Sequence, residues 1–236
     1  IGAGPTGYFT CYELTDRVPG AKVLLIDKGH DIYRRVCPIL QKKIDKCPPP
    51  SGRKKFAGCL PACSITNGFG GAGAFSDGKF NITSEYGGWM TDYLPESTVL
   101  ELIQYVDKIN LRHGAPDKIT NPDSEEVRRI ERRAYAAGLK LLRAKVRHLG
   151  TGQNLEILKD IYEHLRGKID MAFQTEAEDI ITEKTAGGLK VAGVKLKSGE
   201  QIKAKKVVIA PGRDGAIWLS TLLKKRGLKM INNQVD

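Results

Sequence analysis

The chain begins IGAGPTG, a stretch whose glycine spacing can hold a phosphate group. Gly2, Gly4 and Gly7 fit the pattern G-x-G-x-x-G. In that pattern the first glycine permits a tight turn, the second lets the backbone approach a pyrophosphate, and the third lets a helix pack closely. The helix that follows directs the positive end of its dipole at the phosphate. The pattern alone is a weak signal, because it requires a strand before it and a helix after it.

An acidic residue at a matching distance strengthens this interpretation. Asp27 lies 20 residues after Gly7, at the end of the apolar run 23–26, which is typical of a strand buried in a parallel sheet. A carboxylate in this place accepts hydrogen bonds from ribose hydroxyls. The loop and Asp27 together predict a dinucleotide site. The alternative for Asp27 is a surface carboxylate that faces a helix.

A second glycine-rich stretch, CSITNGFGGAGAFSDGKFNIT, covers residues 63–83. Four of the six residues 68–73 are glycine, a density that indicates backbone lying against a flat or anionic ligand. Ser76, Asp77 and Lys79 follow at once, and such side chains can transfer protons or stabilise developing charge. The alternative is a Ser-Asp-Gly turn that is held by its own hydrogen bonds.

Four of the five cysteines, Cys37, Cys47, Cys59 and Cys63, lie close together in the sequence. Three residues separate Cys59 from Cys63, a spacing found in metal sites, so zinc or an iron–sulfur cluster is one interpretation. The other spacings are irregular, and separate buried or redox-active thiols explain them without a metal. We therefore expect no bound metal.

His148 is a further candidate for chemistry. It stands in VRHLGTG, where a predicted strand ends before a helix and where Arg147 and a backbone nest could hold an anion. A histidine with no ligand is equally consistent with this stretch.

The composition is that of an ordinary globular protein, with 41% hydrophobic and 28% charged residues. The formal net charge of +11 has three interpretations: a lysine-rich solvated surface, a nucleic-acid partner or an anionic cofactor. Because the basic stretches lack the interleaved aromatic residues of a single-strand platform, nucleic acid is not the expected partner. With no apolar run near about 18 residues and no basic-then-apolar leader, we expect a soluble, cytoplasmic protein without a membrane span.

The elements that must position these residues follow an α/β pattern. In the first part of the chain we expect a helix after the first loop, a strand at 23–26 and an irregular excursion. The middle part is predicted to contain helices from residue 95, a strand near 139–146 and a helix near 155–165. The last part is predicted to contain a strand within IDMAFQT, a three-stranded meander, a buried strand in VVIAPG and a helix near 216–225.

The order of these segments resembles the flavoprotein fold of the glutathione reductase type. The second signature of that fold, an Ala-x-Gly turn after an apolar strand, is occupied by Ala210 and Gly212, with Pro211 where threonine is usual. The stretches CPI, GGAGAFSDGKFN and VRHLGT together resemble an uncharacterised family of FAD-dependent dehydrogenases, over nearly the whole chain. Members of that family are considerably longer, so we expect this chain to be a piece of a longer protein, cut at both ends.

The resemblance implies an α/β fold: a Rossmann-like FAD-binding domain with a parallel sheet, a small three-stranded meander and a helical, irregular insertion. We expect residues 1–30 to begin the FAD-binding domain and 31–94 to form a Gly/Cys-rich excursion next to the flavin. We expect 95–168 to form a mainly helical insertion and 169–236 to return to the FAD-binding domain.

The resemblance also implies roles for single residues. The first loop would bind the FAD pyrophosphate, Asp27 the adenosine ribose, and the Ala177 backbone the adenine edge. The backbone of residues 70–74 would pass beside the isoalloxazine ring. The predicted cofactor-binding residues are Gly2, Gly4, Pro5, Gly7, Asp27, Lys28, Gly70, Gly71, Ala72, Ala177, Ala210 and Gly212, and the predicted catalytic residues are Ser76, Asp77, Lys79 and His148.

The implied function is that of an FAD-dependent oxidoreductase that passes a hydride or electrons between the flavin and an unidentified substrate. NAD(P)H is a candidate reductant. One alternative is an FAD-containing protein that binds RNA or modifies tRNA, and another is a flavin-binding scaffold without turnover. The expected partner is a small molecule or a redox protein, and the sequence leaves the oligomeric state open.

Overall fold

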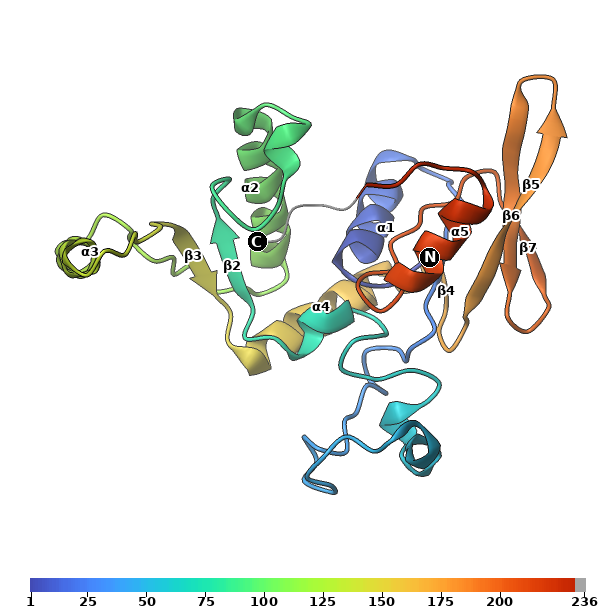
Figure 1. Ribbon diagram of the computed structural model, residues 1–236, viewed down its shortest axis with the longest axis horizontal. Helices are drawn as coiled ribbons and strands as arrows, with labels where there is room; N and C mark the ends of the chain where they lie inside the picture. The colour runs from blue at the N-terminus through green and yellow to red at the C-terminus, as the bar shows by residue number, and fades with distance from the viewer. Residues whose placement is uncertain (232–236) are drawn as a thin grey trace. The chain divides into compact units, whose positions relative to one another are not determined.

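The computed structural model describes residues 1–231 and divides into two compact units (Figure 1). One unit holds residues 1–74 together with the described residues from 161 onward, and the other holds residues 75–160. The end of the predicted segment 169–236, from residue 232, lies outside the described residues. Within residues 1–231, no helix has the length and apolar character needed to cross a membrane.

The first unit contains a small parallel sheet. β1 (Leu24–Ile26) pairs in parallel with β4 (Asp170–Ala172). On the other side of β1, the Gly2 N–H donates to the Ile26 carbonyl at 2.8 Å. The Ile1 amino group donates to the Val208 carbonyl at 2.7 Å, and the Ala210 N–H donates to the Ile1 carbonyl at 2.8 Å, which is a parallel pattern. Extended backbone therefore runs side by side in the order 208–210, 1–2, β1, β4.

Burial in this sheet is lower than the sequence predicts. The expected buried strand in VVIAPG is an extended segment outside the named strands, and Val208 is 48% exposed. Leu24, at the start of β1, is 41% exposed. The prediction of full burial is wrong for both segments. Hydrogen bonds to Ile1 keep residues 208–210 extended without that burial.

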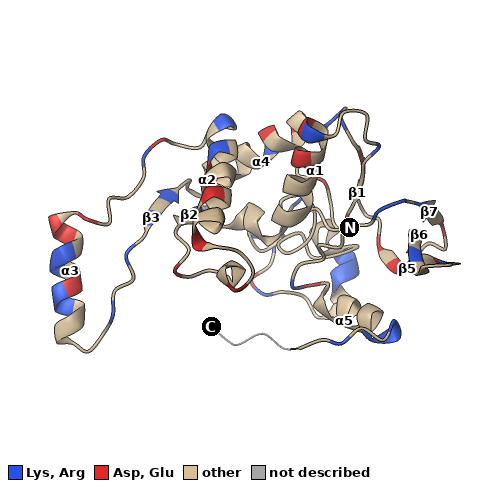
Figure 2. Ribbon diagram, turned by 90° about the horizontal axis from the view of Figure 1, so that it is seen from above, with Lys and Arg blue, Asp and Glu red and all other residues tan. Residues whose placement is uncertain are grey.

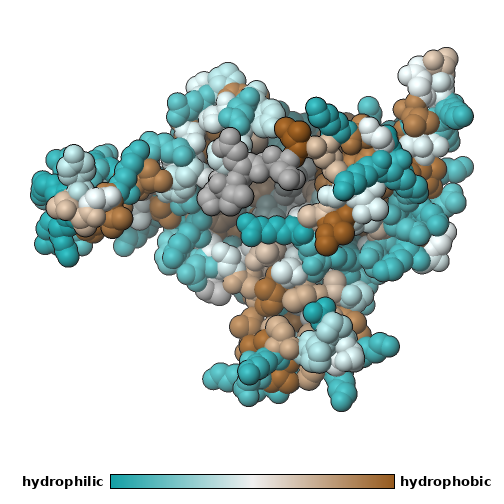
Figure 3. Space-filling model, viewed as in Figure 1, coloured by the Kyte–Doolittle hydropathy of each residue, from teal (hydrophilic) through white to brown (hydrophobic). Residues whose placement is uncertain are grey.

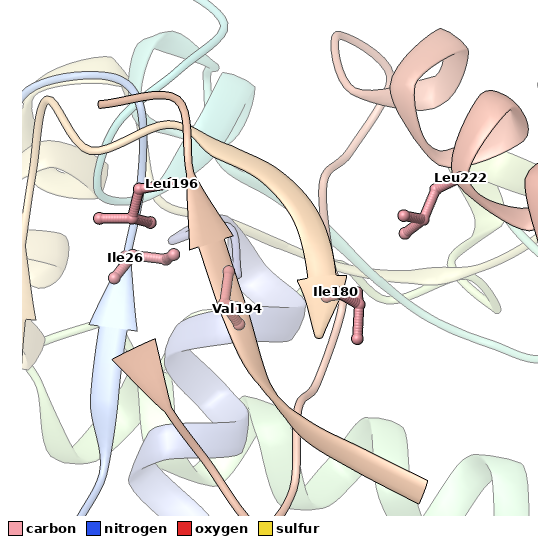
Figure 4. Close-up of a cluster of buried hydrophobic side chains, with 5 residues drawn as sticks. All are labelled: Ile26, Ile180, Val194, Leu196 and Leu222. Carbon is pink, nitrogen blue, oxygen red and sulfur yellow. The ribbon is translucent and has the colours of Figure 1, made fainter. Parts of the chain in front are cut away.

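The predicted meander is confirmed as an antiparallel sheet of β5 (Ala177–Thr185), β6 (Gly188–Leu196) and β7 (Gln201–Lys203). It packs with β1 and α5 (Ala216–Lys225) around one group of buried side chains (Figure 4). That group consists of Ile26, Ile180, Val194, Leu196 and Leu222. The core thus ties the end of β1, where Asp27 follows, to the meander and α5.

A second core of the first unit is aromatic and supports the start of the glycine-rich stretch. Phe69 is fully buried and its ring stacks on that of Tyr8, from α1 (Pro5–Arg17), at 5.5 Å. It is also nearly perpendicular to the ring of Tyr162, with the ring centroids 5.1 Å apart. Tyr162 lies on α4 (Thr151–Leu165), where Ile161 and Leu165 are also fully buried. The first helix and the glycine-rich stretch are therefore held against the same residues.

The second unit is built on an antiparallel pair, β2 (Lys79–Ile82) and β3 (Lys145–His148), against which α2 (Glu96–Arg112) packs. The predicted strand at 139–146 is displaced, because β3 takes its register from β2 and from a buried ion pair. In that pair the Arg147 guanidinium donates to both Asp107 carboxylate oxygens, at 2.6 and 2.7 Å.

The remaining helical elements of the two units are α3 (Glu125–Ala136) and the short 3₁₀ turns η1 (Pro50–Lys55), η2 (Ala57–Cys59), η3 (Gly71–Phe75) and η4 (Met90–Asp92).

The basic stretch on α3 carries both signs of charge, as Figure 2 shows. Arg132 pairs with Glu125 at 2.8 Å, and Arg143 pairs with Glu131 and with Asp123. Neighbouring carboxylates thus offset the charges of Arg132 and Arg143.

Candidate functional site: two glycine-rich segments and Asp27

The three glycines of the first loop have different surroundings, and each suits its predicted role. Gly2 has φ +97°, and a Cβ added there would overlap the Ala210 carbonyl oxygen. A Cβ added at Gly7 would overlap the Gly2 carbonyl oxygen. Gly4 precedes α1 with φ −73°, and a Cβ there would meet only the Gly71 Cα, at 3.8 Å. Gly2 and Gly7 are therefore required by packing, whereas Gly4 faces open space at the helix N-terminus.

The helix after the loop is prepared for an anion. Pro5 is its first residue, where proline removes no intrahelical hydrogen bond, and no side chain caps the helix at Gly4. Backbone N–H groups at such an end are the usual partners of a phosphate.

The Asp27 carboxylate joins three segments of backbone. Its Oδ2 accepts the Ala3 N–H at 2.8 Å, and its Oδ1 accepts the N–H groups of Gly29 at 2.7 Å and Gly68 at 2.9 Å. Asp27 is thus an organising residue, and the alternative of a surface carboxylate is wrong. A carboxylate has about four lone-pair sites, so one remains for a hydroxyl group.

The second glycine-rich stretch lies against the first loop. The Gly70 N–H donates to the Ala3 carbonyl at 2.8 Å. Gly70 and Gly71 have φ +85° and +57°, and a Cβ on Gly71 would come within 3.0 Å of the Gly4 Cα. Ala72 follows and is exposed. Two segments far apart in the sequence therefore form one side-chain-poor backbone surface.

A hollow of about 70 Å³ opens beside Asp27. It brings together four predicted residues, Gly2, Asp27, Lys28 and Ala177, and it also includes Trp218, which no sequence signal identified. This hollow can take a few ligand atoms at a time, so a dinucleotide would run from it across the glycine loop. The remaining lining residues are Ile1, Ile26, Asn67, Thr175, Glu176, Pro211 and Gly215.

Two side chains fix the rim of this hollow. Trp218, on α5, donates its indole N–H to the Glu178 carbonyl at 2.8 Å. Lys28 forms an ion pair with Asp214, two residues after the predicted Gly212 turn. Lys28 therefore reaches across to the turn that contacts Gly2.

A buried arginine shapes the approach to the glycine-rich stretch. The Arg35 guanidinium donates to the carbonyls of Ser64 at 2.6 and 2.9 Å, Ile65 at 3.1 Å and Phe69 at 2.5 Å. Burial lowers the pKa of Arg35 to about 10, so the group is still a cation at neutral pH. Its neighbours in the sequence gave no indication of this role.

The predicted catalytic residues Ser76, Asp77 and Lys79 form a turn in the other unit. Ser76 Oγ accepts the Gly78 N–H at 3.2 Å, and Lys79 Nζ lies 3.6 Å from Asp77 Oδ2. The side chains of Asp77 and Lys79 are 57% and 61% exposed. A Cβ on Gly78 would come within 2.9 Å of Leu149, so the turn is docked on its own unit. These contacts favour the turn interpretation, and the catalytic roles remain predictions.

His148 lies opposite Lys79 in the β2–β3 pair, so two of the four predicted catalytic residues are neighbours. Of the two interpretations left open for this stretch, the anion site is not supported, because the Arg147 guanidinium donates to Asp107 and to the Pro116 carbonyl, the latter at 2.5 Å. The hydrogen bonds that Arg147 donates to Asp107 raise the pKa of Arg147. One titratable pair was missed: His113 Nδ1 lies 2.6 Å from Asp160 Oδ2, with the His113 side chain only 7% exposed.

Comparison with family models and with curated proteins finds no match. Among solved structures, the chain is similar to an L-amino acid deaminase from Proteus vulgaris, with 15% identity and a TM-score of 0.48 over 96% of this chain and 49% of that chain. It is similar to a glycine oxidase from Geobacillus kaustophilus, with 16% identity and a TM-score of 0.45 over 97% and 57%. It is also similar to an L-proline dehydrogenase from P. horikoshii, with 18% identity and a TM-score of 0.40 over 98% and 55%.

The chain spans about half the length of these structures. The identities and TM-scores are too low for a fold or an activity to be transferred from them.

Proposed function

We propose that the protein is an FAD-dependent oxidoreductase, with the first glycine loop as the pyrophosphate site of a Rossmann-like domain. The observation that carries the proposal is the contrast among the loop glycines. At Gly2 and Gly7 other backbone atoms occupy the place where a Cβ would stand. At Gly4 that place is open, at the start of α1, and one added methyl group would occupy it. A loop that served only as a turn would have no need of glycine at this position, where φ is −73°.

The arrangement of the extended segments supports the same proposal. The order 208–210, 1–2, β1, β4 puts the first segment between the second and the returning one, as in dinucleotide-binding folds. In such folds the ligand lies beyond the carboxyl ends of the strands, where the glycine loop and Asp27 are found here.

Each part of FAD has residues that fit it. The loop and the α1 N-terminus would hold the pyrophosphate, and the free lone pair of Asp27 a ribose hydroxyl. Ala177, which lines the same hollow as Asp27, would hold the adenine edge through its backbone. The Ala210–Gly212 turn and the stretch from Gly70 to the exposed Ala72 would flank the remainder of the molecule.

The redox step, in which a substrate gives up a hydride or electrons, is chemistry that the flavin ring supplies when it is bound. The family resemblance favours FAD over a nicotinamide as the bound cofactor, with NAD(P)H as the candidate reductant. The chain's own contribution is to orient the cofactor with backbone and to keep side chains away from its faces. Lys79 and Asp77 are proposed to hold or move a proton, and His148 stands beside Lys79 for the same purpose.

The test compares Gly4→Ala with Gly187→Ala in the full natural protein. We expect the unchanged protein to purify yellow with non-covalent FAD. Because the space at Gly4 is open, Gly4→Ala should leave the melting temperature of the FAD-free protein unchanged and weaken FAD binding about tenfold or more, or about 1.4 kcal/mol. Gly187, in the β5–β6 turn, is also open and should leave FAD binding unaffected.

The readouts are the visible spectrum, the FAD content per chain and a titration with added FAD. A folded, colourless protein that takes up no FAD would overturn the proposal. If Gly4→Ala keeps its full affinity for FAD, the pyrophosphate does not bind at this loop.

A further inference from the structure

Residues 37–63 have too little buried surface to hold their own shape. Between Cys37 and Cys63 only Pro38 and Gly58 are buried, and the only regular structure is the two turns η1 and η2. In Figure 1 this segment is the light-blue to cyan coil, and Figure 3 shows brown, apolar atoms on the surface in the same place. A segment of this length with almost no core needs another source of order, such as a metal or a cross-link.

Backbone contacts bring three of the four cysteines in this segment together. A Cβ added at Gly58 would overlap the Val36 carbonyl oxygen, and the Ser64 N–H donates to the Gly58 carbonyl at 2.9 Å. These three residues are the direct neighbours of Cys59, Cys37 and Cys63 in the sequence. The backbones of Cys37, Cys59 and Cys63 therefore lie next to one backbone contact that glycine alone permits.

The fourth thiol, Cys47, lies in the same segment, in the run that joins Cys37 to Cys59, and it is exposed. None of the four cysteines forms a disulfide. All four thiols are therefore available as metal ligands.

The charge around the thiols is suited to a metal–thiolate centre. Residues 34–55 contain eight basic residues and one acidic residue, Asp45. Four thiolates around a divalent cation leave two negative charges, which a basic surrounding offsets, and nearby cations also lower thiol pKa values. This accounts for the basic residues of this stretch other than Arg35, which have no part in the proposed FAD site.

We propose that Cys37, Cys47, Cys59 and Cys63 together bind one divalent zinc-like cation. Four thiolates are a common ligand set for structural zinc, and this set reverses the expectation drawn from the spacing alone. Within residues 1–231, no group of three or more His, Cys, Asp or Glu side chains already surrounds one point as metal ligands do. Binding must therefore draw the thiols inward, which couples it to ordering of residues 37–63.

The first experiment measures metal in the full natural protein, purified without oxygen or chelators. We expect elemental analysis to find about one zinc per chain. After chelator treatment, added Co²⁺ should give the absorption bands of tetrahedral thiolate coordination, and added Zn²⁺ should abolish them. A protein that binds neither ion in stoichiometric amount would overturn the proposal, and so would iron together with acid-labile sulfide.

The second experiment identifies the ligands without any substitution. Alkylation followed by mass spectrometry should show that bound Zn²⁺ protects Cys37, Cys47, Cys59 and Cys63. Equal labelling of the four with and without Zn²⁺ would overturn the assignment, even if zinc is present elsewhere.

Substitutions give a matched comparison. Cys59→Ser should lose the metal and make residues 37–63 more sensitive to protease, whereas Cys11→Ala, on α1, should keep it. Full metal content in Cys59→Ser would contradict the proposal. Because FAD is not needed for metal binding, a failure here is distinguishable from a failure of the FAD proposal.

Discussion

The first glycine loop and the turn at residues 76–79 are both predicted to serve one cofactor, but they are built differently. In the loop, neighbouring backbone fills the space beside Gly2 and Gly7 and leaves it open beside Gly4. In the turn, Asp77 and Lys79 are exposed and lie near each other. A backbone cradle keeps its geometry without the ligand, whereas the role of an exposed side chain depends on what approaches it.

The largest effect on stability is expected from Gly7→Ala, which changes the packing of the loop itself. The added Cβ would overlap the Gly2 carbonyl oxygen, so α1 must move away from the loop. We expect a loss of about 3 kcal/mol in the free energy of unfolding, measured by urea denaturation. Gly187→Ala is the control, and an equal loss in both variants would show that the close approach at Gly7 is unimportant.

Asp27→Ala should have the next largest effect on stability. It tests whether Asp27 holds the backbone together independently of its role in cofactor binding. It leaves the N–H groups of Ala3, Gly29 and Gly68 without their acceptor. We expect a loss of about 1–3 kcal/mol in stability even without FAD, and weaker FAD binding as well. Unchanged stability of the FAD-free protein would contradict the organising role of Asp27.

A pH titration tests the ion pairs that join β5 to the end of α5. Burial of Asp179 opposes its ionisation, but hydrogen bonds from Lys225 and Arg226 outweigh this and lower its pKa to about 2. The folded pKa is below the unfolded value, so this contribution to stability is full above about pH 5 and is lost as the pH falls toward 2. Asp179→Asn should flatten that part of the stability curve, and a curve identical to that of the unchanged protein would show that the pairs contribute nothing.

The smallest structural effect is expected at the turn. Asp77→Asn and Lys79→Met remove an exposed pair, so stability should change by at most about 1 kcal/mol and FAD should stay bound. If these groups act in catalysis, flavin reduction should slow by about tenfold or more in stopped-flow measurements. A normal rate of flavin reduction in both variants would show that the turn has only a structural role.

The sequence predicted those features of the site that depend on backbone. The glycine spacing, the position of Asp27 and the α5 bounds were readable because turns, strand ends and helix patterns leave local signals. Arg35 and the His113–Asp160 pair were not readable, because their partners are carbonyls and side chains remote in the sequence. The displaced β3 has the same cause, since its register depends on β2 and Asp107.

Trp218 gives the molecule a built-in optical reporter. The chain has two tryptophans, and Trp89 lies in the other unit, so Trp89→Phe leaves a single emitter. Trp218 lines the hollow next to Asp27 and Ala177, and its hydrogen bond to Glu178 restrains the ring. Occupation of that hollow should therefore change the intensity and wavelength of its fluorescence, which allows ligand fragments such as adenosine to be ranked without following any reaction.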